Sequence, residues 1–161
     1  VDIHVMATWS RADQTYPQGR PWFGKPITAM GLDVRAGYDK AAEAAHATSV
    51  VPVGDAWNRA FATGVADTNP YDGIEAGKVN LWATDNYHAS AYGYYLEALT
   101  VFGDLTGIDP RALGTGECAA FEMGFSATQI KALQQVAFDQ LSADHRPLRT
   151  VALTTRAARC K

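Results

Sequence analysis

The sequence is poor in cysteine, in charge and in long apolar runs. Two of its 161 residues are cysteines and 19% are charged. No uncharged stretch approaches the ~18 consecutive apolar residues of a membrane-spanning helix, so no membrane span is predicted. Positive charge is not in excess either, since 14 Lys and Arg residues face 17 Asp and Glu residues and the net charge is −3. We therefore expect no nucleic-acid partner.

The spacing of the cysteines excludes a common type of zinc site. Cys118 and Cys160 lie far apart and lack the C-x-x-C arrangement. In an oxidising compartment they could form a disulfide worth about 3–4 kcal/mol, and in a reducing one they would stay thiols. Both states remain open. We expect no metal and no other cofactor, because a chain of this length can form a core without them.

The first residues of the chain do not identify its compartment. Val1 begins an alternating strand pattern, so a fold is already under way there and any signal peptide would have been lost. The compartment stays open, with a secreted or periplasmic location favoured.

The first third of the chain has the pattern of an α/β protein. The alternating residues 1–7 predict a strand, and the Pro- and Gly-rich segment 9–26 predicts a loop without helix. Residues 32–48 carry apolar side chains at helical spacing, and the β-branched run 49–53 predicts a short buried strand with Pro near its end. Strand, helix and strand in this order indicate a parallel α/β sheet.

A short helix and a long loop are predicted next. The helix covers residues 55–63, with Asp55 as its N-cap and Gly64 at its end. Residues 67–82 are rich in turn formers, and a loop of this length is usually functional.

Two longer helices follow this loop. Ser90 begins the first, which ends near Gly107, and the capping box of Ser126 and Gln129 begins the second. Residues 146–161 then hold five of the 14 basic residues and no acidic one, which predicts an electrically distinct tail.

Asp85 and His88 stand three positions apart in the loop that leads to Ser90. In acyl-transfer chemistry a histidine takes the proton of the nucleophile, and a carboxylate that accepts its Nδ1–H fixes its tautomer. A D-x-x-H turn can supply both groups at once. The spacing is also common in surface turns, so it gains weight only from its context.

The surrounding residues resemble the C-terminal half of the SGNH (GDSL-type) hydrolases. The resemblance covers roughly residues 1–113 and rests on PVGDAWNRAF and ATDNYHASAYGYYLEALTVFGDLTGIDP. The last motif of the family is D-x-x-H, then a small residue, a Ser and a Gly a few positions on, and Asp85, His88, Ser90 and Gly93 match it. The resemblance implies a doubly wound parallel sheet of flavodoxin-like type. It also implies hydrolysis of a small-molecule or carbohydrate ester, with His88 as general base and Asp85 as its partner.

The nucleophile of that family is missing from the chain. The family takes its serine from a G-D-S block at the first strand, whereas Gly54-Asp55-Ala56 has no hydroxyl at the third position. We therefore expect this chain to supply the Asp/His pair, while a complementing N-terminal segment or subunit supplies the serine and the oxyanion hole. The chain alone should be inactive. A sheet divided in this way should also expose its central strands, which predicts either aggregation or a partner that covers the edge.

The loop after the first strand is the predicted substrate-binding segment. Ligands of open α/β sheets bind beyond the carboxyl ends of the strands, where Trp9 and Arg11 lie. Arg11 could hold a carboxylate or a phosphate, and Trp9 or Trp22 could stack on a sugar or an acyl group. The aromatic residues could equally form a local core. Ser10 is a less favoured nucleophile.

The chain is thus expected to have three parts. Residues 1–115 would be the C-terminal half of an SGNH-hydrolase-like domain, and residues 116–145 an appended helix. Residues 111–143 would pack outside the hydrolase-like core, and residues 146–161 would form the basic tail.

Two other functions remain as alternatives. The first is a non-catalytic binding or assembly module derived from the same fold, in which Asp85 and His88 do no chemistry. The second is metal-dependent hydrolysis, in which His4 joins these two residues as a ligand.

Overall fold

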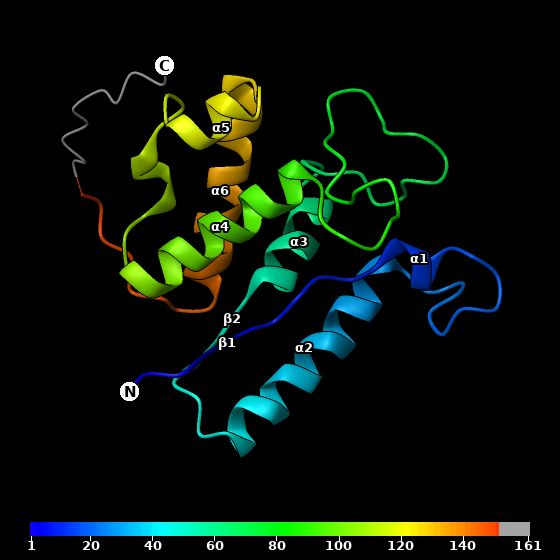
Figure 1. Ribbon diagram of the computed structural model, residues 1–161, viewed down its shortest axis with the longest axis horizontal. Helices are drawn as coiled ribbons and strands as arrows, with labels where there is room; N and C mark the ends of the chain where they lie inside the picture. The colour runs from blue at the N-terminus through cyan, green and yellow to red at the C-terminus, as the bar shows by residue number, and fades with distance from the viewer. Residues whose placement is uncertain (152–161) are drawn as a thin grey trace.

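Two short parallel strands lie between helices in the computed structural model, which describes residues 1–151 (Figure 1). β1 (His4–Met6) pairs with β2 (Ser49–Val51), and Val5 lies opposite Val50. The chain between the strands forms α1 (Ala12–Thr15) and α2 (Ile27–Ala44). The architecture is mixed α/β and mostly helical. The expected strand–helix–strand unit is present, but with two strands the sheet is too small to establish a doubly wound fold.

The segment between β1 and β2 contains more helix than the sequence predicts. α1 is a single turn inside the segment 9–26, which was expected to hold no helix. α2 begins at Ile27 instead of near residue 32, directly after Pro26. Buried Ile27 anchors this first turn in the core, and tertiary contacts of this kind outweigh the weak local propensity of the sequence.

α3 (Val53–Ala62) begins at Val53, a residue that the sequence placed in the preceding strand. Pro52 stands directly before the helix and Val53 opens it. Asp55 is therefore in the first turn and is not the N-cap. Its carboxylate is favoured there by the positive end of the helix dipole, and it pairs with Arg35 at 2.6 Å. Gly64 follows the helix with φ +70°, as expected for a helix stop.

The chain from Gly64 to Ser90 is irregular, as its turn residues predict. Two isolated bridges hold it, one between Ala66 and Val79 and one between Trp82 and Ala89. In Figure 1 this long green loop lies near α1, on the side toward which the carboxyl ends of β1 and β2 point. The loop is thus placed where open α/β sheets bind ligands.

The remaining elements are helical. α4 (Ala91–Thr106) is capped by Ser90, whose hydroxyl accepts from the Gly93 amide, and Gly107 ends it in the left-handed conformation. The predicted capping box of Ser126 and Gln129 is present. The elements that follow α4 are the 3₁₀ helix η1 (Pro110–Leu113), α5 (Cys118–Glu122) and α6 (Ala127–Ala143).

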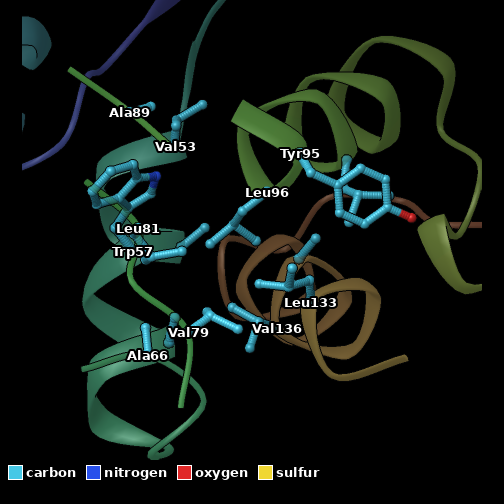
Figure 2. Close-up of a cluster of buried hydrophobic side chains, with 14 of the residues drawn as sticks. Val53, Trp57, Ala66, Val79, Leu81, Ala89, Tyr95, Leu96, Leu133 and Val136 are labelled. Carbon is cyan, nitrogen blue, oxygen red and sulfur yellow. The ribbon is translucent and has the colours of Figure 1, made fainter. Parts of the chain in front are cut away.

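A single large core joins α3, α4 and α6. Figure 2 shows Trp57 of α3, Leu96 of α4 and Leu133 of α6 directed into the same cluster, and all three are fully buried. α4 and α6 approach so closely that a side chain on Gly103 would overlap Leu141. The expectation that residues 111–143 pack outside the core is therefore wrong. The helix stripe that begins at Ser126 is apolar because it closes this core.

The described chain ends soon after α6. Arg146, the first residue of the predicted basic tail, forms an ion pair with buried Asp104 at 2.9 Å and donates to the Val50 carbonyl at 2.8 Å. The tail from residue 152 onward lies outside the described residues. The predicted alternatives for Cys118 and Cys160 also fall there, because Cys160 is among those residues. Within residues 1–151, no helix has the length and apolar character needed to cross a membrane.

Candidate functional site

His88 and Asp85 form the hydrogen bond that the D-x-x-H spacing predicts. His88 Nδ1 lies 2.6 Å from Asp85 Oδ2. The His88 side chain is 63% exposed and that of Asp85 is 48% exposed, so the pair is open to a reaction partner. The catalytic role of the pair remains a prediction.

The Asp85 carboxylate is held by three donors within its own turn. Its Oδ1 accepts from the backbone amides of Tyr87 and His88 at 3.1 and 3.0 Å. The bond from the His88 ring, followed by these two amides, lowers the pKa of Asp85 to about 2. At neutral pH the carboxylate is ionised and can only accept hydrogen bonds. His88 Nδ1 must therefore carry the proton, which leaves Nε2 of the neutral ring as a free base.

The backbone around the pair is closed into a tight turn. The amides of Ala83 and Asn86 donate to the carbonyls of His88 and Ala83 at 2.8 and 3.0 Å, respectively. Asn86 adopts φ +57°, a left-handed conformation that Asn tolerates better than most residues. This turn brings residues 85 and 88 to the same side.

Ser90 and Gly93 connect the turn to α4. The Ser90 hydroxyl donates to the Asn80 carbonyl at 2.7 Å and accepts from the Gly93 amide at 3.3 Å. A Cβ at position 93 would overlap the Leu81 carbonyl and approach Trp57 to 2.6 Å. Both motif residues are thus explained by helix capping and close packing, and neither needs to act in chemistry.

The loop after β1 contacts the turn directly. Trp9 Nε1 donates to the Tyr87 carbonyl at 3.1 Å, and the Arg11 guanidinium lies 4.0 Å from the centre of the Tyr87 ring. Asp13 N donates to the Asn86 carbonyl at 3.1 Å. Two of the three predicted binding residues, Trp9 and Arg11, are therefore next to the Asp/His pair.

Trp22 has a different environment. Its indole N–H donates to Asp33 on α2 at 2.8 Å. Among the described residues it makes no hydrogen bond or ring contact with the turn that holds His88. The sequence grouped Trp22 with Trp9 because both lie in one aromatic segment, but the segment folds back on itself between them.

Two aromatic residues that were not predicted as site residues, Tyr87 and Tyr94, lie beside His88 and Trp9. The centre of the Tyr87 ring lies 4.7 Å from that of the His88 ring and 4.0 Å from the Arg11 guanidinium. Tyr94 is 49% exposed and meets the edge of Trp9 at 6.1 Å. The sequence did contain a sign of both residues. Tyr87 stands inside the D-x-x-H motif, and Tyr94 stands in the first turn of the helix that follows it.

Trp9 is also part of a core. It stacks on Trp57 with ring centres 4.8 Å apart and an angle of 8°. The local-core interpretation of the aromatic loop therefore holds for Trp9, which also contacts the turn beside His88. Its role in substrate binding remains a prediction.

Ser10 does not have the geometry of a nucleophile. It is fully buried, and its hydroxyl has no hydrogen-bond partner. In the described part of the chain, no hydroxyl is hydrogen-bonded to Nε2 of His88. Ser10 is thus not placed as a nucleophile for His88.

A serine, a histidine and an aspartate meet at the amino-terminal ends of β1 and β2, away from Asp85 and His88. His4 Nδ1 lies 2.8 Å from Ser49 Oγ and 3.6 Å from Asp104 Oδ2. In a catalytic triad the serine and the carboxylate bind different ring nitrogens, whereas here both lie at Nδ1. The geometry is that of a structural cluster. Metal hydrolysis with His4 fails as well, because residues 1–151 hold no group of three His, Cys, Asp or Glu side chains that could bind an ion.

A cavity of about 400 Å³ lies beside the site. Trp9 and Arg11 form one wall and α2 forms the other, with Asp33 among its lining residues. The lining does not include Asp85 or His88. The cavity therefore touches the site only through the loop after β1.

Comparison with known proteins adds no assignment. No family model, no curated protein and no solved structure matches this chain.

Proposed function

We propose that this chain supplies the Asp/His half of an SGNH-like serine hydrolase that acts on a small-molecule or carbohydrate ester. The observation that carries the proposal is the 2.6 Å bond between Asp85 and the ring of exposed His88. His88 Nε2 is the general base, and Asp85 holds the ring in the tautomer that leaves this nitrogen free. β1 and β2 are then two strands of a larger, doubly wound parallel sheet.

The chemistry requires a serine from another segment. His88 removes the serine proton as the hydroxyl attacks the ester carbonyl, and the resulting imidazolium is stabilised by ionised Asp85. The alkoxide leaving group then takes this proton from His88. Water attacks the acyl-enzyme in the second half of the reaction, with His88 again as base.

Trp9, Arg11 and Tyr87 support the site in this proposal. Trp9 and Arg11 hold the turn from one side through Tyr87, and the exposed part of this aromatic surface offers a place for the sugar or acyl group. Trp22 has no place beside the reacting atoms in this proposal, because within residues 1–151 its indole bonds to Asp33 and not to the turn that holds His88.

The test restores the missing serine. An SGNH-hydrolase N-terminal half with its G-D-S block is joined ahead of Val1, and hydrolysis of p-nitrophenyl acetate is measured. His88→Ala should lower turnover by about 10²–10⁴-fold. Thr84→Ala, an exposed change in the same turn, is the matched control. If the fusion is active and His88→Ala retains more than about a tenth of that activity, the pair is not catalytic. The binding-module hypothesis then takes its place.

A further inference from the structure

The peptide unit that joins Tyr87 to His88 is hydrogen-bonded at both of its ends. Its carbonyl, on Tyr87, accepts from Trp9 Nε1 at 3.1 Å. Its amide, on His88, donates to Asp85 Oδ1 at 3.0 Å. This peptide is trans, so its C=O and N–H point in opposite directions. One rigid unit therefore connects the Trp9 indole to the Asp85 carboxylate.

The preceding peptide unit, from Asn86 to Tyr87, repeats the arrangement. Its carbonyl accepts from the Asp13 amide at 3.1 Å, and its amide donates to the same oxygen of Asp85 at 3.1 Å. A donor at the carbonyl polarises the peptide and strengthens the bond that the N–H makes at the other end. Both amides that hold Asp85 Oδ1 thus belong to peptide units whose carbonyls accept from the loop after β1. With Oδ1 fixed in this way, Oδ2 lies 2.6 Å from His88 Nδ1.

Trp9 is the one side chain that the loop contributes to these bonds, and the core fixes its place. Its ring stacks on that of buried Trp57 of α3, with the ring centres 4.8 Å apart. The carbonyl of the next residue, Ser10, accepts from the buried indole of Trp82 at 2.9 Å. A residue anchored in the core therefore holds the exposed turn in which the Asp/His pair lies.

We propose that Trp9 is a positioning residue for the Asp85–His88 pair. Its indole N–H orients the peptide unit between Tyr87 and His88. The amide of this unit then fixes one oxygen of Asp85, so that the other oxygen faces the His88 ring. Trp9 needs no contact with a substrate for this role. The effect on the pair follows from these contacts, whereas an effect on turnover rests on the proposed function.

Trp9→Phe removes the indole N–H and keeps an aromatic ring against the core. In NMR of the chain alone, the His88 amide should exchange about fivefold faster, as expected for the loss of one neutral hydrogen bond. The pKa of Asp85 should rise from about 2 toward its ordinary value, since its amide donors are then less well oriented. Trp22→Phe is the matched control and should change neither signal, because its indole N–H bonds to Asp33, away from the turn.

Asp85→Ala tests the same bonds from their other end, at an exposed position of the turn. Loss of the carboxylate leaves the peptide between Tyr87 and His88 free to rotate. The Trp9 indole proton should then exchange about fivefold faster, while the Trp22 indole proton is unchanged. This measurement needs no substitution in the core, so it decides the question if Trp9→Phe does not fold.

Turnover of the fusion protein separates positioning from contact with the substrate. Trp9→Phe should lower kcat and leave KM unchanged, whereas loss of a substrate contact raises KM. A folded Trp9→Phe chain with the same His88 exchange and Asp85 midpoint as Trp22→Phe would overturn the proposal, whatever its KM. A Trp9 indole proton that does not respond to Asp85→Ala would also overturn it. Coupled NMR signals, in a fusion whose turnover does not depend on His88, would support the positioning role and reject the proposed function.

Discussion

Arg11 lies with its guanidinium 4.0 Å from the centre of the Tyr87 ring, and that ring lies 4.7 Å from the ring of His88. These two contacts join the loop after β1 to the turn before α4. The two segments are far apart in sequence, yet both contact Tyr87, the neighbour of His88. The surroundings of His88 therefore include a loop that only the fold brings to it.

Loss of the Arg11 side chain should remove the cation–π contact with Tyr87. Arg11→Ala should lower the free energy of unfolding by about 0.5–1 kcal/mol, as expected for a partly exposed cation over an aromatic ring. Urea denaturation measures this, and NMR shifts of the His88 ring report its orientation. Arg20→Ala, at an exposed loop position, is the control and should change stability by less than about 0.5 kcal/mol. Equal effects of the two variants would show that the Arg11–Tyr87 contact contributes nothing to stability.

The Asp85 carboxyl should titrate with a pKa of about 2, well below its usual value. Because folding lowers this pKa, the contribution of the group to stability is present above the ordinary carboxyl pKa of about 4 and is lost as pH falls toward 2. The carboxyl carbon shift of Asp85 measures the midpoint. In His88→Ala the two backbone amides remain, so the midpoint should rise part of the way to its ordinary value. An unchanged midpoint in that variant would contradict the bond.

Asp85→Asn tests the tautomer of His88. An amide can stabilise the wrong ring tautomer, and a loss of about 10⁴-fold is known for this change in a Ser-His-Asp triad. We expect turnover of the fusion protein to fall by two to four orders of magnitude while the circular dichroism spectrum is unchanged. Nitrogen NMR of the His88 ring should show the proton on Nδ1 in the wild-type chain. A proton on Nε2 would contradict the base assignment.

Gly93 and Gly37 should respond in opposite ways to alanine. A Cβ at Gly93 would overlap the Leu81 carbonyl, so Gly93→Ala should cost about 1–3 kcal/mol through overpacking. The Cβ at Gly37 meets open space inside α2, so Gly37→Ala should stabilise the chain by about 0.5–1 kcal/mol. Thermal unfolding compares the two variants directly. Equal and small effects would show that α4 can shift away from the turn.

Leu133 tests whether α6 belongs to the core. Leu133 points from α6 into the core and is fully buried. Leu133→Ala should therefore lower the free energy of unfolding by about 2–5 kcal/mol. Lys131→Ala, on the exposed face of the same helix, should change stability by less than about 0.5 kcal/mol. Removal of residues 116–161 should then unfold the chain and with it the Asp85 turn. A folded truncated chain that retains the Asp85–His88 bond would restore the appended-helix hypothesis.

Local signals in the sequence determined the features that need only a few neighbouring residues. Ser90 and Ser126 cap their helices as predicted because a hydroxyl reaches an amide three positions ahead. The Asp85–His88 bond belongs to the same class, since one turn of chain holds both groups and two backbone amides. The glycine that stops α3 and the turns after it were predictable for the same reason.

Tertiary structure alone decided the features that depend on distant partners. The burial of Leu133 against α3 and α4 places α6 in the core, although its local pattern fits an appended helix equally well. Trp9 and Trp22 have similar surroundings in the sequence, but only Trp9 reaches the turn of His88, because the chain folds back between them. The burial of Ser10 was equally invisible in the sequence. The physical reason is that burial and long-range contact depend on where other elements pack, whereas caps and turns depend on residues a few positions away.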